Sequence, residues 1–239
     1  MIGAIRMAWV LIGLVTSVSA QVTQGKIVYE RKTNLFKKYK DDWSREWIKE
    51  KDKTKIDVFE LYFNDSLSVF KPEESDIKEQ MSWTTSKNSV YQDLSHNKRL
   101  TIKNIWGEYV YVQDSLWRRK WKITESKRTI CGFLCRKAIW QINDTTRMYA
   151  WYCNEIVTSV GPESFTGLPG AILGLATEDG GVIYFAKKVE LTQQEPSMLV
   201  PKKVKGRIYA TSELRTKFQK EYGKEQWGKD FIHENFDIW

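Results

Sequence analysis

A short loop with an unusual density of glycine and proline constrains the fold of this chain more than any other stretch. Residues 161–170 hold three glycines and two prolines, and strand-like runs at 140–153 and 171–175 flank them. Glycine permits positive φ and proline fixes φ, so the backbone here has a defined path. The loop contains one acid, Glu163, and no histidine or lysine. We interpret it as a shaped apolar corner and not as a reaction centre.

Alternation of apolar and polar residues predicts many short strands along the rest of the chain. Asn64, Asp65 and Ser66 are turn residues between two such runs, which predicts a hairpin. Ser212 is a candidate N-cap for a C-terminal helix with Leu214 and Phe218 on one face. This pattern predicts a mainly β (α+β) fold, a curved antiparallel sheet or partly open barrel with one or two helices. The expected strands cover 26–30, 57–63, 67–70, 89–92, 100–103, 109–113, 129–142, 147–152, 181–186 and 204–209.

The first twenty residues have the pattern of a signal peptide. Arg6 precedes an apolar run at 7–15, and small residues lead up to a cleavage site near Ala20. An uncleaved anchor is the alternative, but the run is shorter than the ~20 residues that a membrane span needs. We therefore expect a periplasmic or secreted mature chain, 21–239, that forms a single domain without a transmembrane span.

The charge balance limits the partners that the chain is expected to have. The full chain has a formal net charge of +8, and its basic residues are spread over short runs at 37–38, 118–120, 187–188 and 202–203. Such runs are usually solvated surface. In an exported protein they allow peripheral contact with an anionic membrane, and we expect no nucleic-acid partner. The charged segment 35–55 fits either a helix face or a mobile insertion.

Three cysteines lie at positions 131, 135 and 153. If the hairpin of 129–142 and 147–152 turns at Asn143 and Asp144, Cys135 faces Cys153 across the two strands. An oxidising compartment would then favour a Cys135–Cys153 disulfide. Cys131 would lie about 13 Å from Cys135 along an extended strand and would remain a free thiol. The alternative is that all three cysteines are small buried hydrophobes.

Catalytic and metal-binding patterns are weak in this sequence. His96 and His233 are the only histidines, whereas a zinc site needs three or four clustered ligands. No nucleophile elbow, metalloprotease motif or phosphate-binding glycine loop occurs. We predict no metal, no cofactor and no enzymatic activity, and a thiol enzyme using Cys131 is the least favoured hypothesis.

Aromatic side chains are abundant in the middle of the chain and are the most numerous candidates for contact with a ligand. They fit either a core that requires large side chains or a concave sheet that holds an apolar ligand. On the second view, the predicted ligand-binding residues are Trp121, Trp140, Tyr149, Trp151, Leu168 and Pro169.

Five segments together resemble the GLPGLI family of exported bacterial proteins. The motif that names the family reads Gly-Leu-Pro-Gly-Ala-Ile here, so Ala171 replaces a leucine. The resemblance covers about 57–190. It implies an exported fold and no particular activity, because the family has no established function. The segments are 121–123, 132–138, 147–152, 161–162 and 167–172.

These observations lead to two principal functional hypotheses. The first is a periplasmic or outer-membrane-associated binding or carrier module for an apolar or lipidic ligand, without catalysis. The second is an accessory interaction protein of an outer-membrane assembly or transport complex. The basic surface, segment 35–55 and the aromatic C-terminal residues 231–239 motivate the second hypothesis.

Overall fold

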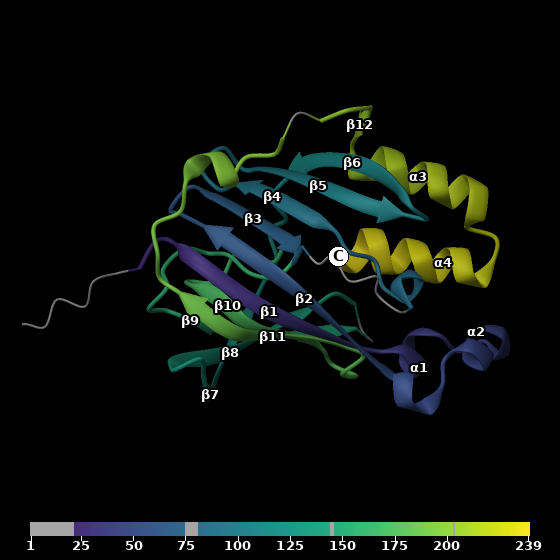
Figure 1. Cartoon of the computed structure of the whole chain (residues 1–239), viewed down its shortest axis with the longest axis horizontal. Coiled ribbons are helices and arrows are strands. Elements are labelled where there is room, and N and C mark those ends of the chain that lie inside the picture. Colours follow the sequence, from purple (N-terminus) through teal and green to yellow (C-terminus); the bar gives the residue numbers. More distant parts are fainter. Residues whose placement is uncertain (1–21, 75–80, 144–145, 203) are drawn as a thin grey trace, which may run out of the picture.

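The computed structural model describes residues 22–74, 81–143, 146–202 and 204–239, so the predicted signal peptide lies outside the described residues. Strands dominate this part of the chain, and helices occur near its two ends (Figure 1). The strands are β1 (Gly25–Asn34), β2 (Thr54–Phe63), β3 (Leu67–Pro72), β4 (Ser89–Asp93), β5 (Lys98–Ile105), β6 (Glu108–Ser115), β7 (Lys122–Ile130), β8 (Phe133–Gln141), β9 (Arg147–Cys153), β10 (Ala171–Thr177), β11 (Val182–Glu190) and β12 (Ile208–Tyr209). The helices are α1 (Leu35–Lys38), α2 (Asp42–Trp47), α3 (Thr211–Tyr222) and α4 (Gln226–Ile232), with short 3-10 helices η1 (Glu50–Asp52), η2 (Ser82–Thr84) and η3 (Pro196–Met198) and a π-helical segment η4 (His233–Ile238).

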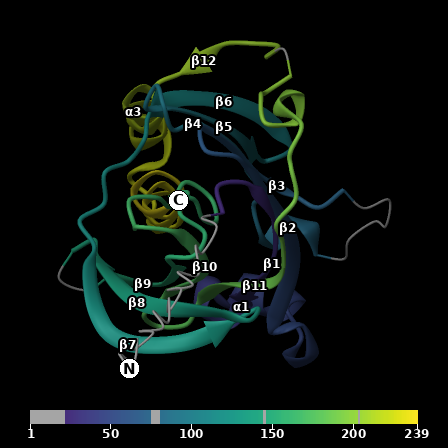
Figure 2. The same cartoon turned by 90° about the vertical axis from the view of Figure 1, so that its left-hand side faces the viewer.

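The twelve strands of the described residues belong to one sheet, in the order β12-β6-β5-β4-β3-β2-β1-β11-β10-β9-β8-β7. Neighbours pair antiparallel except β12 and β6, which are parallel. The end strands β12 and β7 are not neighbours, so the sheet is open. Figure 2 shows β5 and β6 on one side and β7 and β8 on the other, with α3 and the C-terminal residues between them. The predicted mainly β fold with an antiparallel sheet and a C-terminal helix is confirmed.

The β2–β3 hairpin forms for the reason that its turn residues suggest. The side-chain oxygen of Asn64 accepts hydrogen bonds from the backbone N–H of Ser66 at 2.9 Å and of Leu67 at 2.7 Å. These bonds reverse the chain locally, as an Asx turn does. The predicted hairpin is confirmed, and its strands pair from Phe59 opposite Pro72 to Phe63 opposite Ser68.

The single strand expected at 129–142 is wrong, because the chain reverses within it. Cys131 and Gly132 have φ of 50° and 84°, and they join β7 to β8. Two consecutive residues at positive φ are typical of a tight hairpin turn whose twist matches that of the strands. Cys131 therefore lies in a turn, and it does not continue the strand of Cys135.

The C-terminal helix is present, but Ser212 does not cap it. Helix α3 begins at Thr211 after Ala210, which provides no side-chain cap. Instead, the carboxylate of Asp114 on β6 accepts a hydrogen bond from the Thr211 N–H at 3.0 Å. A negative charge at a helix N-terminus is favourable because the first N–H groups lack partners within the helix. The predicted face is confirmed, since Leu214 and Phe218 are buried.

Two apolar clusters hold these elements together. The larger one packs β1, β2 and β3 against β8–β11 and the loop before β10, and it includes the stacked rings of Phe59 and Phe70, with centroids 4.8 Å apart. The smaller one joins β5 and β6 to α3, α4 and η4. Within the described residues, no helix is both long enough and apolar enough to span a membrane.

Candidate binding cavity

Three of the six predicted ligand-binding residues belong to the filled part of the core. Trp140 and Leu168 are buried in the larger cluster, and Trp121 packs against it. The Trp121 indole donates a hydrogen bond to the Thr166 carbonyl at 2.9 Å, and its ring lies 6.3 Å from that of Phe165. These side chains pack against the Gly/Pro loop and stabilise its position.

The other three predicted residues have different surroundings. Tyr149 and Trp151 lie on the face of β9 opposite Ala150 and Tyr152, where Lys137 is 3.9 Å from the Tyr149 ring centre and Arg128 is 4.9 Å from that of Trp151, and Trp151 also packs against the larger cluster. Pro169 is exposed. The structure therefore does not bring the six residues together, and none of them lines either of the two cavities described below.

The predicted register of the cysteines is confirmed, but the predicted disulfide is absent. Cys135 lies opposite Cys153 in the β8–β9 pair, yet both are free thiols, as is Cys131. Each buried sulfur has another partner: Cys135 Sγ donates to the Phe133 carbonyl at 3.6 Å, and Cys153 Sγ accepts from the Glu155 N–H at 3.3 Å. Burial raises the pKa of Cys135 to about 12 and also raises the pKa values of the other two thiols, so the thiolate form is disfavoured.

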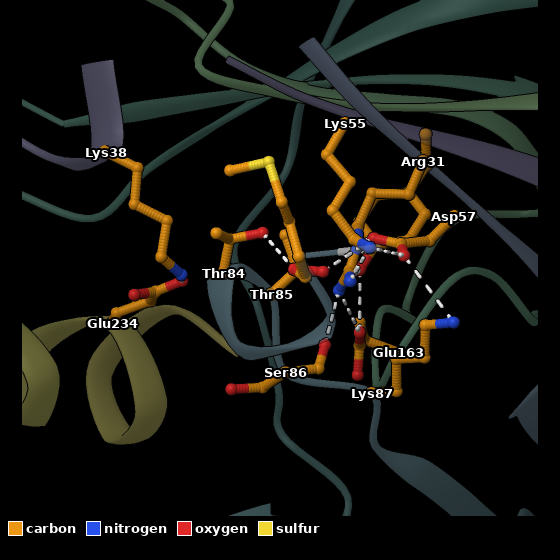
Figure 3. Close-up of polar contacts among 12 residues, drawn as sticks. Arg31, Lys38, Lys55, Asp57, Thr84, Thr85, Ser86, Lys87, Glu163 and Glu234 are labelled. Carbon is orange, nitrogen blue, oxygen red and sulfur yellow. Dashed lines mark hydrogen bonds and ion pairs between the residues drawn. The ribbon is translucent and has the colours of Figure 1, made fainter. Parts of the chain in front are cut away.

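A buried ion network crosses β1 and β2 (Figure 3). Arg31 on β1 lies opposite Asp57 on β2, and Arg31 Nη2 is 2.7 Å from Asp57 Oδ2. Thr85 donates to the same oxygen at 2.9 Å, while Lys55 Nζ and Lys87 Nζ are each 3.6 Å from Asp57 Oδ1. Burial works to raise the pKa of Asp57, but Arg31, Thr85 and Lys55 together outweigh it and hold this pKa below its usual value.

Glu163 from the Gly/Pro loop is the second acid of this network. Its backbone has a φ of 53°, a conformation that costs energy for any residue except glycine. The Tyr184 hydroxyl donates to Glu163 Oε1 at 2.7 Å, and Arg31 Nη1 lies 4.0 Å from the same oxygen. Burial raises the pKa of Glu163 although both neighbours favour the ionised form. The interpretation of the loop as a purely apolar corner is therefore wrong.

Gly170 shows why the loop keeps this shape. Its φ is 144°, and a β-carbon at this position would lie 1.9 Å from the carbonyl oxygen of Cys153. Only glycine allows the end of the loop to approach β9 this closely. The close approach fixes where the loop returns to the sheet and, with it, the place of Glu163.

Glu163 lines two cavities. The smaller, next to Arg31 and Thr85, has a volume of about 20 Å³, which is room for about one water molecule. The larger has a volume of about 380 Å³, which lies within the range of about 300–1,000 Å³ typical of small-molecule sites. Asn235 and Trp239 of the C-terminal segment also line both. Only the larger cavity can hold an organic ligand.

The wall of the larger cavity combines apolar and charged side chains. Its charged groups come from β5, β6, the Gly/Pro loop and α3, and hydroxyl groups such as those of Thr101 and Ser164 lie among them. The apolar lining residues are Val90, Val112, Leu116, Trp117, Phe236 and Trp239, and the charged ones are Arg99, Lys103, Asp114, Glu163 and Arg215.

Three buried cations lie in or next to this wall. Lys103 Nζ donates to the Asn235 carbonyl at 2.7 Å, and burial lowers the pKa of Lys103 to about 8. Arg119 donates to the Ser164 carbonyl at 2.8 Å, and burial lowers its pKa to about 9. Burial also lowers the pKa of Arg99. Burial and mutual repulsion disfavour the charged form of such groups.

Histidines contribute to neither cavity. His96 contacts Asp93 at 2.8 Å, and His233 contacts Asp237 at 3.2 Å. Across the described ranges, no group of three or more histidine, cysteine, aspartate or glutamate side chains is arranged to hold a metal ion.

Comparisons with known proteins agree with the fold and add no activity. A family model described as "Protein of unknown function (Porph_ging)" matches residues 140–174, from the end of β8 to the middle of β10. No curated protein matches the chain. A structure of PNGF-II in the C2 space group is similar, with a TM-score of 0.52 and 15% identity over 79% of this chain and 31% of that chain. A second structure of PNGF-II, in the P21 space group, gives a TM-score of 0.51 and 14% identity over the same shares. The chain spans about a third of the length of these proteins, to which it is similar in fold.

Proposed function

We propose that this protein is a non-catalytic binding or carrier module whose ligand site is the cavity of about 380 Å³ between β4–β6, α3 and Glu163. The volume of the cavity and its mixed lining carry the proposal. Ligand sites are typically concave and largely apolar, with a few polar groups that orient the ligand. Trp117, Phe236 and Trp239 offer surface for an apolar body, which fits the predicted apolar ligand but uses aromatic residues other than the six predicted ones.

The location belongs to the same proposal. The N-terminal pattern of residues 1–20 and the Gly-Leu-Pro-Gly-Ala-Ile motif at 167–172 support assignment to the exported GLPGLI family. The match of 140–174 to a family of unknown function is compatible with that assignment. The mature chain would then work in the periplasm or at the outer membrane.

A titration with the neutral dye phenylnaphthylamine tests the binding site. We expect saturable fluorescence enhancement with the mature chain, because the dye can bury its rings against Trp117 and Trp239. Ser212→Trp places a large side chain at the cavity rim, on α3, and should weaken this binding about tenfold. The matched control, Lys217→Trp, changes an exposed position of the same helix outside the lining and should leave binding unchanged.

Native mass spectrometry of protein purified from its own cell envelope provides the second test. The proposal expects a bound small molecule in the unaltered chain and less of it in Ser212→Trp. If the chain purifies without any ligand and the dye does not bind, the cavity is not a binding site.

An interaction role remains the second candidate because one surface exposes several large aromatic side chains. Trp106 and Tyr109, at the β5–β6 turn, and Trp227, at the start of α4, are 61%, 67% and 53% exposed, and the Trp106 and Trp227 rings lie 6.4 Å apart. Exposed apolar patches of this kind often mark protein contacts.

Site-specific photo-crosslinking in cells tests this second role. A crosslinker at position 227 should give one discrete adduct with an envelope protein, whereas a crosslinker at Lys217 should give none. Equal crosslinking from both positions, or none from position 227, would contradict the interaction role.

A further inference from the structure

We infer that the cavity binds a small organic anion, whose negative group lies near Arg99 and Lys103, with Arg119 next to the wall, and whose apolar body lies against Trp117, Phe236 and Trp239. This inference rests on the proposed binding function and names the chemical class of the ligand. It depends on the charge balance of the cavity, which the described side chains leave incomplete.

Two of the three buried cations in or next to the cavity wall lack an acidic partner. In the part of the chain that the structure describes, no carboxylate lies within 4.0 Å of the charged nitrogens of Lys103 or Arg119. Arg99 is 3.8 Å from Asp114. All three side chains are largely buried, and Lys103 and Arg119 are only 4% and 6% exposed. Buried charges are normally paired, because an unpaired one pays most of its desolvation cost without compensation.

The two acids in the cavity wall already interact with other groups. Asp114 accepts hydrogen bonds from both the backbone N–H and the hydroxyl of Thr211, at the start of α3. Glu163 accepts from the Tyr184 hydroxyl and lies near Arg31. Neither acid is therefore available as a full partner for Lys103 or Arg119, so the cavity keeps an excess of positive charge.

Hydrogen-bond donors without acceptors also indicate an anionic ligand. The Nε groups of Arg99 and Arg119 are buried and have no hydrogen-bond partner. Lys103 has three donors, of which one bonds the Asn235 carbonyl. The Arg119 guanidinium lies 3.8 Å from the Phe165 ring centre, which holds it in place but accepts no ordinary hydrogen bond. Carboxylate, sulfonate and phosphate groups carry the acceptor oxygens and the charge that these cations lack.

A matched pair of dyes tests the inference. Phenylnaphthylamine and anilinonaphthalene sulfonate share their rings, and only the second carries an anionic group. The unaltered chain should bind the sulfonate about tenfold more tightly than the neutral dye, since one charge-assisted contact contributes at least this much.

Lys103→Met removes a charge of the cavity wall and keeps the side-chain length. It should abolish the tenfold preference, because it should weaken binding of the sulfonate about tenfold more than binding of the neutral dye. Arg99→Gln should reduce the preference in the same way, and the control Lys217→Met, at an exposed position, should preserve it.

A displacement experiment separates the two sources of such an anion. Phenylbutyrate should displace the sulfonate dye, its amide should not, and vesicles containing phosphatidylglycerol should have no effect beyond that of neutral vesicles. Displacement by the anionic vesicles but not by phenylbutyrate would overturn the inference in favour of a lipid surface.

The outcomes also separate the two proposals. Equal binding of both dyes, with sensitivity to Ser212→Trp, would overturn the anion inference and keep the binding function. If neither dye binds, or if Ser212→Trp changes neither, both proposals are wrong.

Discussion

Two buried groups of charges meet at Glu163, and they are organised in opposite ways. Around Asp57, each charge has an opposite partner, and the adjoining space of about 20 Å³ admits about one water molecule. Around Lys103, buried cations lie beside about 380 Å³ of space, and neither Lys103 nor Arg119 has a carboxylate within 4.0 Å among the described residues. A cluster in which every charge has an opposite neighbour, here called balanced, serves the fold, whereas a cluster with unpaired cations beside a cavity, here called unbalanced, costs stability and indicates a ligand.

The largest expected change in stability follows removal of the acid Asp57 from the balanced group. Asp57→Ala leaves Arg31 buried without its closest partner, so the free energy of unfolding should fall by about 3–5 kcal/mol. Urea denaturation monitored by circular dichroism measures this loss. Glu221→Ala, an exposed acid on α3, is the control and should change stability by less than about 0.5 kcal/mol. If Asp57→Ala lost no more stability than Glu221→Ala, the network would contribute little to the fold.

Removal of a cation from the unbalanced group should raise the free energy of unfolding instead of lowering it. Lys103→Met replaces a buried charge by an apolar side chain of similar length, and the free energy of unfolding should rise by about 1–4 kcal/mol at neutral pH. The same urea experiment measures it, with Lys217→Met as control. A clear loss of stability would show that Lys103 contributes to the fold as Asp57 does, and the comparison would fail.

The pH dependence of these two variants sharpens the comparison. Burial lowers the pKa of Lys103 from 10.5 to about 8, so between these values the unfolded chain binds more protons than the folded chain. Stability contributed by this group therefore increases with pH in that window. The advantage of Lys103→Met should shrink from pH 7 to about pH 10.

Asp57 should behave differently because its pKa is held below 3.8 in the folded chain. Its contribution is present above that value and is lost as the pH falls through the folded pKa. The deficit of Asp57→Ala should thus stay constant between pH 7 and about pH 10. Urea denaturation across this range checks both statements, and parallel pH curves for the two variants would contradict them.

The smallest expected effect concerns the residue that the two groups share. Tyr184→Phe keeps the ring and removes the hydroxyl that donates to Glu163, and the free energy of unfolding should fall by about 1.5 kcal/mol. Tyr91→Phe, on β4, is the matched control. The loss should be smaller at acidic pH, where the raised pKa of Glu163 leaves its carboxyl protonated and uncharged. A loss independent of pH would indicate that the hydroxyl contributes without regard to the charge of Glu163.

Local patterns predicted much of the fold because strands and turns are encoded over a few residues. The alternation from Asp57 to Phe63 and the side chain of Asn64 were sufficient for the β2–β3 hairpin. The turn at Cys131 and Gly132 was missed, since the apolar pattern continues through it and cysteine is rarely associated with positive φ. Ser212 was assigned as a cap because the actual partner of the helix, Asp114, is distant in sequence.

One signal for the buried network is present in the sequence. Asp57 has the same strand parity as Phe59 and Leu61, and Arg31 has the same parity as Ile27 and Tyr29, so both charges lie on a face that is otherwise apolar. A charge at such a position requires a buried partner. Strand parity alone is therefore enough to single out both residues as a candidate pair.

The cavity itself was not predictable from local pattern. Its wall combines β4, β5, β6, the Gly/Pro loop and the C-terminal segment, and long-range strand order decides that these meet. The six predicted residues were selected for aromatic character near the loop, but there the rings fill the core or lie on the outer face of β9. Composition indicates how much apolar surface a chain has, and only packing decides where some of it remains uncovered.

The tight return of the loop at Gly170 has a practical consequence for engineering this chain. A reporter peptide grafted into 161–170 would shift Glu163. It would therefore disturb both the buried ion network around Arg31 and the proposed ligand cavity. The turn at Gly180, where a β-carbon would meet nothing within 4 Å, offers a more tolerant place for such a graft.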